Sequence, residues 1–323
     1  MDEFNHELIN VNALTIHVVS DGPIDAPPVV MCHGFPETWY SWRHQLSALG
    51  AAGYRAIAFD WRGYGESSCP REVSDYGSDR LTEDLCGLLD HYGYEQATFL
   101  GHDWGALALW EMARLHPSRV RALFNMSVPL ATPHRAPLEM YDAVFAEQFF
   151  YINYFQPVGV AEAELEGDTR HFLRDFYYSA SGDGMKSGKA FTPAPREGTT
   201  LLSTLAEAPG VFPSWLSEKD IDTFAAAFAT SGFFGPLSFY RNIDANWRRS
   251  KDIALSTLTM PIAFLTGSLD PVRFMMAGVA EAMGDLLPDF RGVIEIDDVG
   301  HWIQQERPEE TTRAVLRFLD ATK

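Results

Sequence analysis

The sequence predicts an α/β protein whose core is interrupted by a helical insertion. Short apolar runs and helical patterns alternate from about residue 28 to about residue 128, which is typical of a parallel sheet covered by helices on both faces. The alternation stops after Pro129 and returns at about residue 255. We therefore expect core segments at residues 1–130 and 255–323, with residues 131–254 forming the insertion.

The first core segment contains a hairpin followed by alternating strands and helices. The stretch ELINVNALTIHVV alternates apolar and polar residues on either side of Asn12-Ala13, which predicts the hairpin. The next elements are expected, in chain order, as a strand in PPVVMCHG, a helix in SWRHQLSALGAAG, a strand in YRAIAFDWRG, a helix in DRLTEDLCGLLDHYG, a strand in QATFLGHD, a helix in WGALALWEMARLHP and a strand in VRALFNMSVP.

The second core segment repeats this rhythm. We expect a strand and loop in MPIAFLTGSLDP, a further strand in GVIEIDDVGH and a closing helix in RPEETTRAVLRFL, which has proline at its start. Within the insertion, the stretch SASGDGMKSGKAFTPAPREGTT is expected to be a loop because of its composition.

The composition is that of a globular protein with an acidic surface. The chain has 323 residues, of which 46% are hydrophobic and 21% charged, and its 25 Lys+Arg against 44 Asp+Glu give a net charge of -19. Such a surface repels phosphate backbones and anionic lipids, so nucleic-acid and membrane binding are not expected. The odd number of cysteines, 3, without a CxxC pair, and the polar start MDEFNHELIN, which is unlike a signal peptide, predict a cytoplasmic protein.

The stretch GHDWGA at residues 101–106 has the form of a nucleophile elbow, with Asp103 where such turns usually carry serine. An apolar run precedes it and a helical pattern follows it, which is the strand–turn–helix context of the elbow. In that context the turn lifts the side chain above the sheet edge, and the helix N-terminus below it favours an anion. The alternative is an aspartate that caps the following helix.

Two later stretches supply the partners of a nucleophile. Asp270 in TGSLDP follows one apolar strand, and His301 in DDVGHWIQQERP follows the next. The order of nucleophile, acid and histidine is that of the α/β-hydrolase triad. The alternatives are a turn-forming aspartate and a structural histidine. Asp297 and Asp298 are rivals for the acid, although their place on the histidine's own loop makes the far ring nitrogen hard to reach.

The stretch MCHGFPETW supplies a fourth element, an oxyanion hole. One backbone N–H comes from a loop after an early strand and the other from the residue after the nucleophile, so Phe35 and Trp104 are the candidates. We expect Pro36 to shape the loop through a cis bond. The alternative for HGFP is an ordinary tight turn.

The combination of motifs resembles the epoxide hydrolases of the α/β-hydrolase superfamily that have a helical cap. The matching motifs are HGFPE, DWRGYGES, GHDWGA, LD at 269–270 and VGHW. The stretches YFQPVGVAEAELE at 154–166 and GPLSFYRN at 235–242 resemble the two cap segments of the soluble members. The resemblance covers nearly the whole chain. It implies an α/β-hydrolase fold with a mostly parallel, eight-stranded type of sheet flanked by helices, and a cap inserted at 131–254.

The resemblance also implies that two cap tyrosines hold the epoxide oxygen. By position these are Tyr151 and Tyr240, with Tyr154 as a close rival for the first. Tyr154, Phe35 and Trp104 are expected to contact the substrate. The alternative for the tyrosines is aromatic packing within the cap.

The chemistry of a carboxylate nucleophile points the same way. An aspartate carries its negative charge at neutral pH and needs no base to activate it. Its attack on an ester would give a high-energy anhydride, whereas its attack on a saturated carbon gives a stable ester. Asp103 therefore indicates substitution at carbon, followed by hydrolysis of the ester by water that His301 activates.

The sequence leaves two other functions open, a haloalkane-type dehalogenase and a non-catalytic receptor. A haloalkane-type dehalogenase uses the same aspartate and needs N–H donors for the halide, which Trp104 is able to supply. A non-catalytic receptor with a hydrolase fold usually lacks a triad member, and none is missing here. We expect a small lipophilic epoxide and water as partners, no cofactor and no metal, and we leave the oligomeric state open, with a homodimer as one option.

Overall fold

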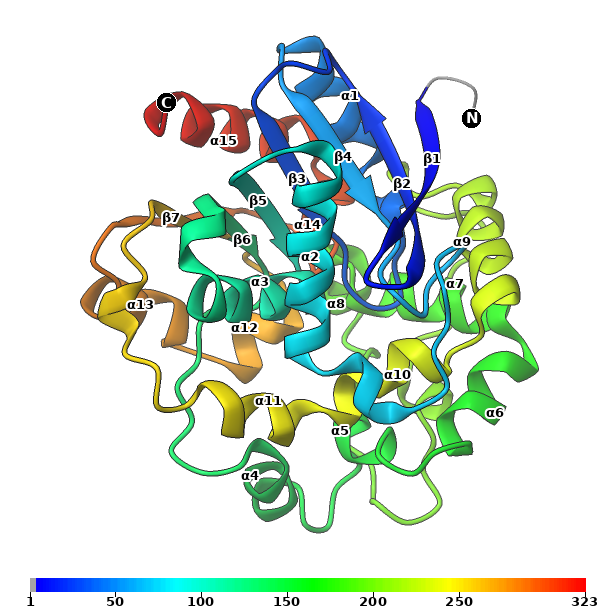
Figure 1. Ribbon diagram of the computed structural model, residues 1–323. Coiled ribbons are helices and arrows are strands. Elements are labelled where there is room, and N and C mark those ends of the chain that lie inside the picture. The colour runs from blue at the N-terminus through cyan, green and yellow to red at the C-terminus, as the bar shows by residue number, and fades with distance from the viewer. Residues whose placement is uncertain (1–3) are drawn as a thin grey trace.

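The computed structural model describes residues 4–323 and contains an eight-stranded sheet in the order β1-β2-β4-β3-β5-β6-β7-β8 (Figure 1). The strands are β1 (Asn5–Val11), β2 (Leu14–Asp21), β3 (Pro28–Cys32), β4 (Arg55–Phe59), β5 (Ala97–His102), β6 (Val120–Met126), β7 (Ile262–Gly267) and β8 (Phe290–Ile296). β2 pairs antiparallel with β1 and β4, and the pairs from β4 to β8 are parallel. The predicted mostly parallel sheet is confirmed.

The N-terminal hairpin turns where the sequence predicts it. Asn12 and Ala13 join β1 to β2 with positive φ angles of 48° and 64°. Both lie in the left-handed region, and a two-residue turn with positive φ at both positions matches the twist of the paired strands.

Helices cover both faces of the sheet. The core helices are α1 (Arg43–Ala51), α2 (Ser78–Tyr92), α3 (Trp104–Leu115), α12 (Pro271–Met275), α13 (Val279–Leu286), α14 (Ile303–Glu306) and α15 (Pro308–Ala321). Val29 and Met31 of β3 pack in one apolar cluster with α1 and α15, whereas Val30 and Cys32 pack in the other with α2 and α3. The period-2 alternation of the strand thus fills two separate core layers.

The insertion between β6 and β7 is helical. It contains α4 (Pro137–Val144), α5 (Tyr151–Tyr154), α6 (Val160–Gly167), α7 (Thr169–Ala180), α8 (Gly182–Ser187), α9 (Glu218–Ser231), α10 (Phe234–Arg241) and α11 (Ile243–Ser250). In Figure 1 these helices lie below and to the right of the sheet, and their aromatic side chains join the same apolar cluster as α2 and α3. We call this insertion the cap; its limits at residues 131 and 254 stay a prediction.

One expectation within the cap is wrong. The stretch from Ser179 to Thr200 was expected to be a loop, but its first part forms α8. Ser181 caps this helix, because its side chain accepts a hydrogen bond from the Gly184 amide. The glycines that suggested a loop are required by packing, since a Cβ on Gly184 would lie 1.9 Å from the carbonyl oxygen of Tyr178.

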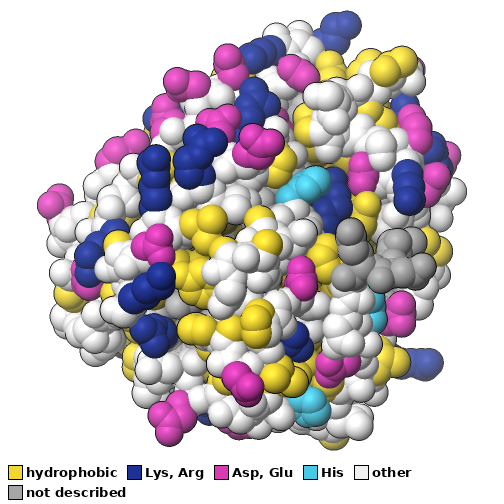
Figure 2. Space-filling view, turned by 90° about the horizontal axis from the view of Figure 1, so that it is seen from above, with side chains coloured by type: hydrophobic (Ala, Val, Ile, Leu, Met, Phe, Trp, Pro, Cys, Tyr) yellow, Lys and Arg dark blue, Asp and Glu magenta, His cyan; other side chains and the backbone are white. Residues whose placement is uncertain are grey.

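The surface carries charges of both signs. Figure 2 shows acidic and basic side chains interspersed with small hydrophobic areas over one face, rather than one continuous basic area. Among the described residues, no helix is long and apolar enough to cross a membrane. Cys32, Cys69 and Cys86 are free thiols.

Candidate active site

The predicted triad residues come together at the carboxyl edge of the parallel strands. Asp103 directly follows β5, Asp270 lies shortly after β7, and His301 lies in the loop beyond β8. The His301 Nδ1 atom lies 3.1 Å from Asp270 Oδ1, and its Nε2 atom lies 3.7 Å from Asp103 Oδ2. Ligands of parallel α/β sheets bind at this edge, so the three side chains lie where the fold places its chemistry.

The backbone at Asp103 is strained in the way that an elbow requires. Its φ is 50° and its ψ is -116°, an unusual conformation for a residue other than glycine. The residue occupies the N-cap position of α3, but its side chain makes no capping hydrogen bond. The helix-capping alternative is therefore wrong, and the carboxylate points instead toward the HGFP loop and His301.

His301 is held by two side chains at the same ring nitrogen. Besides Asp270, the Ser127 Oγ atom lies 2.9 Å from His301 Nδ1. Because a carboxylate only accepts, the proton of the neutral ring belongs on Nδ1, which leaves Nε2 as the base facing Asp103. Burial lowers the pKa of His301, but the negative charges of Asp270 and Asp103 outweigh it and raise the pKa to about 9.

Asp297 and Asp298, the alternatives to Asp270 as the partner of His301, lie at the surface. Asp297 and Asp298 are exposed, and Asp298 pairs with Lys186 at 2.7 Å. Asp270 is fully buried, and its Oδ1 also accepts a hydrogen bond from the Val272 amide at 2.9 Å. The geometry therefore favours Asp270 as the partner of the histidine.

The HGFP loop approaches Asp103 closely. The Phe35 amide donates a hydrogen bond to Asp103 Oδ1 at 2.8 Å, and the Phe35-Pro36 bond is cis, as expected. A Cβ on Gly34 would lie 2.4 Å from Asp103 Cβ, so only glycine permits this approach. The Trp104 amide makes no hydrogen bond with the Asp103 side chain within residues 4–323, so one of the two predicted donors is seen in contact.

Two cap tyrosines line the cavity that contains Asp103. Tyr151 begins α5 and Tyr240 lies in α10, and their ring centroids are 5.9 Å apart. Trp104 packs edge-on against Tyr240, with centroids 4.8 Å apart. Burial, and after it the charge of Asp103, raises the pKa of both tyrosines above the usual value. Both phenols thus keep their protons at neutral pH and are able to donate them.

Tyr154 lies away from this group. Its hydroxyl donates to Glu164 Oε2 at 2.9 Å, and its side chain does not line the cavity that contains Asp103. The expectation that Tyr154 contacts the substrate is therefore not supported. The neighbouring tyrosine of α7, Tyr177, is also engaged, because its hydroxyl donates to the Pro36 carbonyl.

The cavity has a volume of about 790 Å³ and runs outward from Asp103 between α3 and the cap. Apolar side chains of α3, α4 and α11 line part of the cavity, namely Trp104, Leu107, Ala108, Met140, Tyr141, Val144, Ile243 and Trp247. The Phe35 side chain is not part of this wall, although its backbone reaches Asp103. The expected substrate contact of Phe35 stays a prediction.

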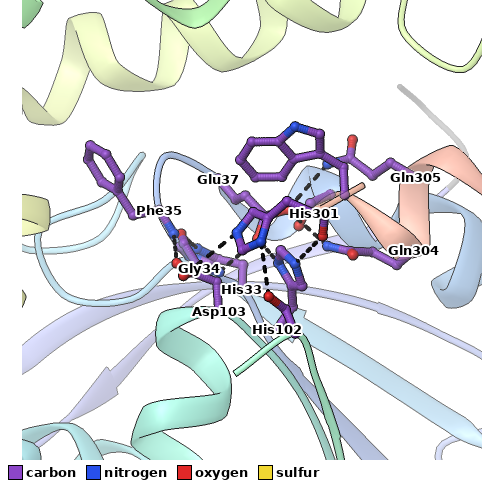
Figure 3. A network of polar contacts seen from close by, with 12 residues as sticks. His33, Gly34, Phe35, Glu37, His102, Asp103, His301, Gln304 and Gln305 are labelled. Carbon is purple, nitrogen blue, oxygen red and sulfur yellow. Dashed lines mark hydrogen bonds and ion pairs between the residues drawn. The ribbon is translucent and has the colours of Figure 1, made fainter. Parts of the chain in front are cut away.

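A buried polar network lies behind the triad (Figure 3). His102 Nδ1 lies 2.6 Å from Glu37 Oε2, and His102 Nε2 lies 2.8 Å from the carbonyl oxygen of His301. Glu37 also accepts from the Gly34 amide at 2.9 Å and from the side chain of Gln304 at 2.9 Å. Burial by itself raises the pKa of Glu37, but His102 and the Gly34 amide outweigh burial and lower the pKa below its usual value. The carboxylate is therefore ionised and accepts hydrogen bonds. The network joins the HGFP loop, the elbow and the His301 loop.

The sequence-based analysis missed Ser127, Glu37 and His102. The last two lie inside the motifs HGFPE and GHDWGA, and their signal is an ionisable side chain that ends a buried strand, as His102 does, or lies in the loop after one, as Glu37 does. Ser127 follows β6, the strand next to the elbow strand, and has a positive φ of 69°. A strained, buried serine beside a catalytic strand is recognisable only after folding.

The site contains no obvious metal ligand set. Within the described residues, no group of three or more His, Cys, Asp or Glu side chains is arranged to hold a metal ion.

Comparisons with known proteins agree with this geometry. Residues 27–308 match the family model described as alpha/beta hydrolase fold. The chain is 42% identical over 315 residues to epoxide hydrolase A of Mycobacterium tuberculosis (strain ATCC 25618 / H37Rv), covering 97% of this chain and 96% of the relative. It is 37% identical over 327 residues to epoxide hydrolase 1 of Siraitia grosvenorii, covering 99% of each.

Solved structures give the same result. The crystal structure of epoxide hydrolase A from Mycobacterium thermoresistibile matches with a TM-score of 0.91 at 40% identity and covers 98% of each chain. An epoxide hydrolase from an endophytic Streptomyces matches with a TM-score of 0.92 at 36% identity and covers 99% of this chain and 96% of that one. These similarities set aside the dehalogenase and receptor alternatives. The chain belongs to the epoxide hydrolases of the alpha/beta hydrolase fold family.

Proposed function

We propose that this epoxide hydrolase opens a lipophilic epoxide to a vicinal diol through an ester on Asp103. The observation that carries the proposal is the juxtaposition across one cavity of a charged carboxylate, two protonated tyrosines and a histidine. A carboxylate attacks carbon, a tyrosine protonates oxygen, and the histidine has no role until an ester exists.

The first step is substitution at a ring carbon. Asp103 Oδ1 is occupied by the Phe35 amide, so Oδ2 is the attacking atom. As the carbon–oxygen bond breaks, negative charge develops on the epoxide oxygen, and Tyr151 and Tyr240 donate hydrogen bonds and a proton to it. A tyrosine suits this task because it stays protonated at neutral pH yet is more acidic than an alkoxide.

The second step is hydrolysis of the ester. His301 Nε2 takes a proton from water, and the resulting hydroxide attacks the carboxyl carbon of Asp103. The oxyanion that forms is stabilised by the Phe35 amide and by the Trp104 amide at the start of α3. When the ester bond breaks, His301 returns its proton to the leaving alkoxide, the second proton of the water passes from the Asp103 carboxyl group to the tyrosinate left by the first step, and the diol departs.

The charge of Asp103 links the two steps. That charge contributes to the raised pKa of His301, and ester formation removes it. The pKa of His301 in the alkyl-enzyme is therefore lower than about 9, so the base becomes available when hydrolysis requires it.

The cavity supports an apolar substrate. Its inner wall between α3 and α11 is built from Trp104, Leu107, Ile243 and Trp247. The volume of about 790 Å³ is large for a single ring, so an extended or bulky lipophilic epoxide fits.

A substrate screen tests the proposal. Styrene-type, aliphatic and fatty-acid epoxides are assayed for diol and haloalkanes for halide, with Asp103→Asn as the matched control. We expect diol from epoxides and no halide, and no diol from the control. Halide release at a comparable rate, or diol formation by the control without deamidation of the new asparagine, contradicts the proposal.

A further inference from the structure

A single buried carboxylate joins the cap to the loop that carries His301. Glu306 lies at the end of α14 and is 6% exposed. Its Oε2 accepts a hydrogen bond from the Gly182 amide of α8 at 2.9 Å. The other carboxylate oxygen, Oε1, accepts from the amides of Gly300 and Trp302, each at 3.2 Å. Gly300 and Trp302 are the residues immediately before and after His301, so one side chain binds both flanks of the histidine and the cap.

The same junction holds the backbone of His301 itself. The His301 amide donates to the carbonyl of Ala180 in the cap at 2.8 Å. The His301 carbonyl accepts from His102 in the core at 2.8 Å. The indole N–H of Trp302 donates to the carbonyl of Tyr177 at 2.7 Å. The loop is thus fixed between cap and core.

In this junction the backbone of the His301 loop is in direct contact with the backbone of the cap. A Cβ on Gly300 would lie 2.4 Å from the carbonyl oxygen of Ala180 and 2.4 Å from the Gly182 nitrogen. A displacement of the cap segment at 177–182 is therefore transmitted to the histidine loop without an intervening side chain.

A carboxylate suits this position better than an amide. Three backbone N–H groups converge on two oxygens, and both oxygens of Glu306 accept. Glutamine has one acceptor oxygen, and its NH₂ group would face an N–H donor. Burial is costly for the charge and raises the pKa of Glu306 to about 7, although the three amides lower it.

We propose that Glu306 is a positioning residue for ester hydrolysis, because it locks cap segment 177–182 to both flanks of His301. The lock sets the position of Nε2 relative to the ester carbon on Asp103. The proposal rests on the role given to His301 in the proposed function. Since alkylation does not use His301 as a base, Glu306 affects the second step and not the first.

The test compares Glu306→Gln with Glu309→Gln, an exposed glutamate in the first turn of α15. Rapid-quench experiments with styrene oxide at pH 8.5 measure alkylation and hydrolysis separately on folded protein. We expect Glu306→Gln to slow hydrolysis about tenfold or more, since small displacements of a reacting group have effects of this size. Alkylation should stay within about twofold, the alkyl-enzyme should accumulate, and Glu309→Gln should behave as wild type.

A second variant, Gly182→Ala, keeps the proposal testable if Glu306→Gln does not fold. In Gly182→Ala the new Cβ would lie 2.6 Å from the carbonyl oxygen of Asp298 and 3.3 Å from Glu306 Oε2, so it displaces the cap side of the junction while the Glu306 carboxylate is retained. It should show the same selective loss of hydrolysis. Equal losses in both steps, or unchanged hydrolysis in either folded variant, overturn the proposal.

His301→Gln separates this proposal from the one on which it rests. If His301→Gln accumulates the alkyl-enzyme but Glu306→Gln does not, only the role of Glu306 fails. If His301→Gln hydrolyses the ester at the wild-type rate, the role of His301 fails, and the role of Glu306 fails with it.

Discussion

At the scale of single residues, the proposed mechanism assigns nucleophilic attack to Asp103 and activation of water to His301. In serine hydrolases the histidine activates the nucleophile first and water later. Here the nucleophile is charged from the start, and the His301 Nε2 atom is 3.7 Å from it, beyond a hydrogen bond. This distance agrees with the proposal that the histidine activates water and not the nucleophile.

Replacement of His301 by Gln should trap the intermediate. Alkylation needs only the Asp103 carboxylate and the tyrosines, so it should proceed, whereas hydrolysis should nearly stop. Intact-protein mass spectrometry should show protein plus one substrate. Loss of both steps in a folded variant would be inconsistent with this division. Asp270→Asn should slow hydrolysis for a related reason, because the imidazole loses its orienting partner.

Ser127→Ala tests the second partner of the histidine. The variant removes one hydrogen bond at Nδ1 and leaves Asp270 in place. A hydrogen bond of this kind contributes about 1 kcal/mol, so hydrolysis should slow about fivefold while alkylation is unchanged. Circular dichroism verifies that the variant is folded. Unchanged hydrolysis in Ser127→Ala would show that Asp270 alone orients the ring.

At the scale of elements, the proposed mechanism takes its nucleophile from the core and its proton donors from the cap. The elbow between β5 and α3 fixes Asp103, and α5 and α10 carry Tyr151 and Tyr240. The two groups meet only because the cap folds over the carboxyl edge of the sheet (Figure 1).

Tyr→Phe changes in the cap should act on the first step. Each of Tyr151→Phe and Tyr240→Phe removes one donor to the developing alkoxide and should slow alkylation about tenfold or more. The double variant should nearly abolish alkylation, with circular dichroism used to verify folding. Tyr154→Phe is a matched control, since its hydroxyl binds Glu164. A double variant that alkylates at the wild-type rate would show that the donors lie elsewhere, with Tyr177 and Tyr178 the next to test.

The elements of the core were predictable because their patterns are local. β5, the elbow and α3 follow each other without a gap, and the sequence shows the apolar run, the glycines and the helical spacing directly. The α8 helix was not predictable in this way. Its glycines and serines are typical of loops, whereas in the structure Ser181 caps the helix and Gly184 packs against the end of α7.

The polar partners of the site were harder to predict than its reacting groups. Asp103, Asp270 and His301 have recognisable positions after strands, whereas Ser127, Glu306 and the Glu37–His102 pair owe their roles to contacts between distant segments. The choice between Tyr151 and Tyr154 was open for the same reason. Which of them faces the cavity depends on the rotation of α5, and a helix of four residues has no pattern that fixes it.

At the scale of the whole molecule, the buried histidine should affect stability. The pKa of His301 is raised from 6.5 to about 9, so the folded protein binds a proton more tightly than the unfolded chain. The stabilisation is complete below about pH 6.5 and is lost as the pH rises through about 9, with a limit of roughly 3 kcal/mol.

Denaturant unfolding of wild type and His301→Gln between pH 6 and pH 10 checks this. The free energy of unfolding of the wild type should fall more steeply between about pH 6.5 and pH 9 than that of the variant. The difference between the two curves isolates the contribution of His301 from that of other histidines, such as His17, whose pKa is also raised. Parallel curves would mean that folding does not raise the pKa of His301.

The most direct test of the mechanism is a single turnover in water enriched in oxygen-18. If Asp103 forms an ester and water attacks its carbonyl carbon, one heavy oxygen should enter the Asp103 carboxylate in the first turnover. Digestion and mass spectrometry of the peptide that contains residues 101–106 measures it, with His301→Gln as the unlabelled control. The account predicts label on Asp103 and, in that first turnover, none in the diol. Label in the diol with Asp103 unlabelled would show that water attacks the epoxide directly and would contradict the account.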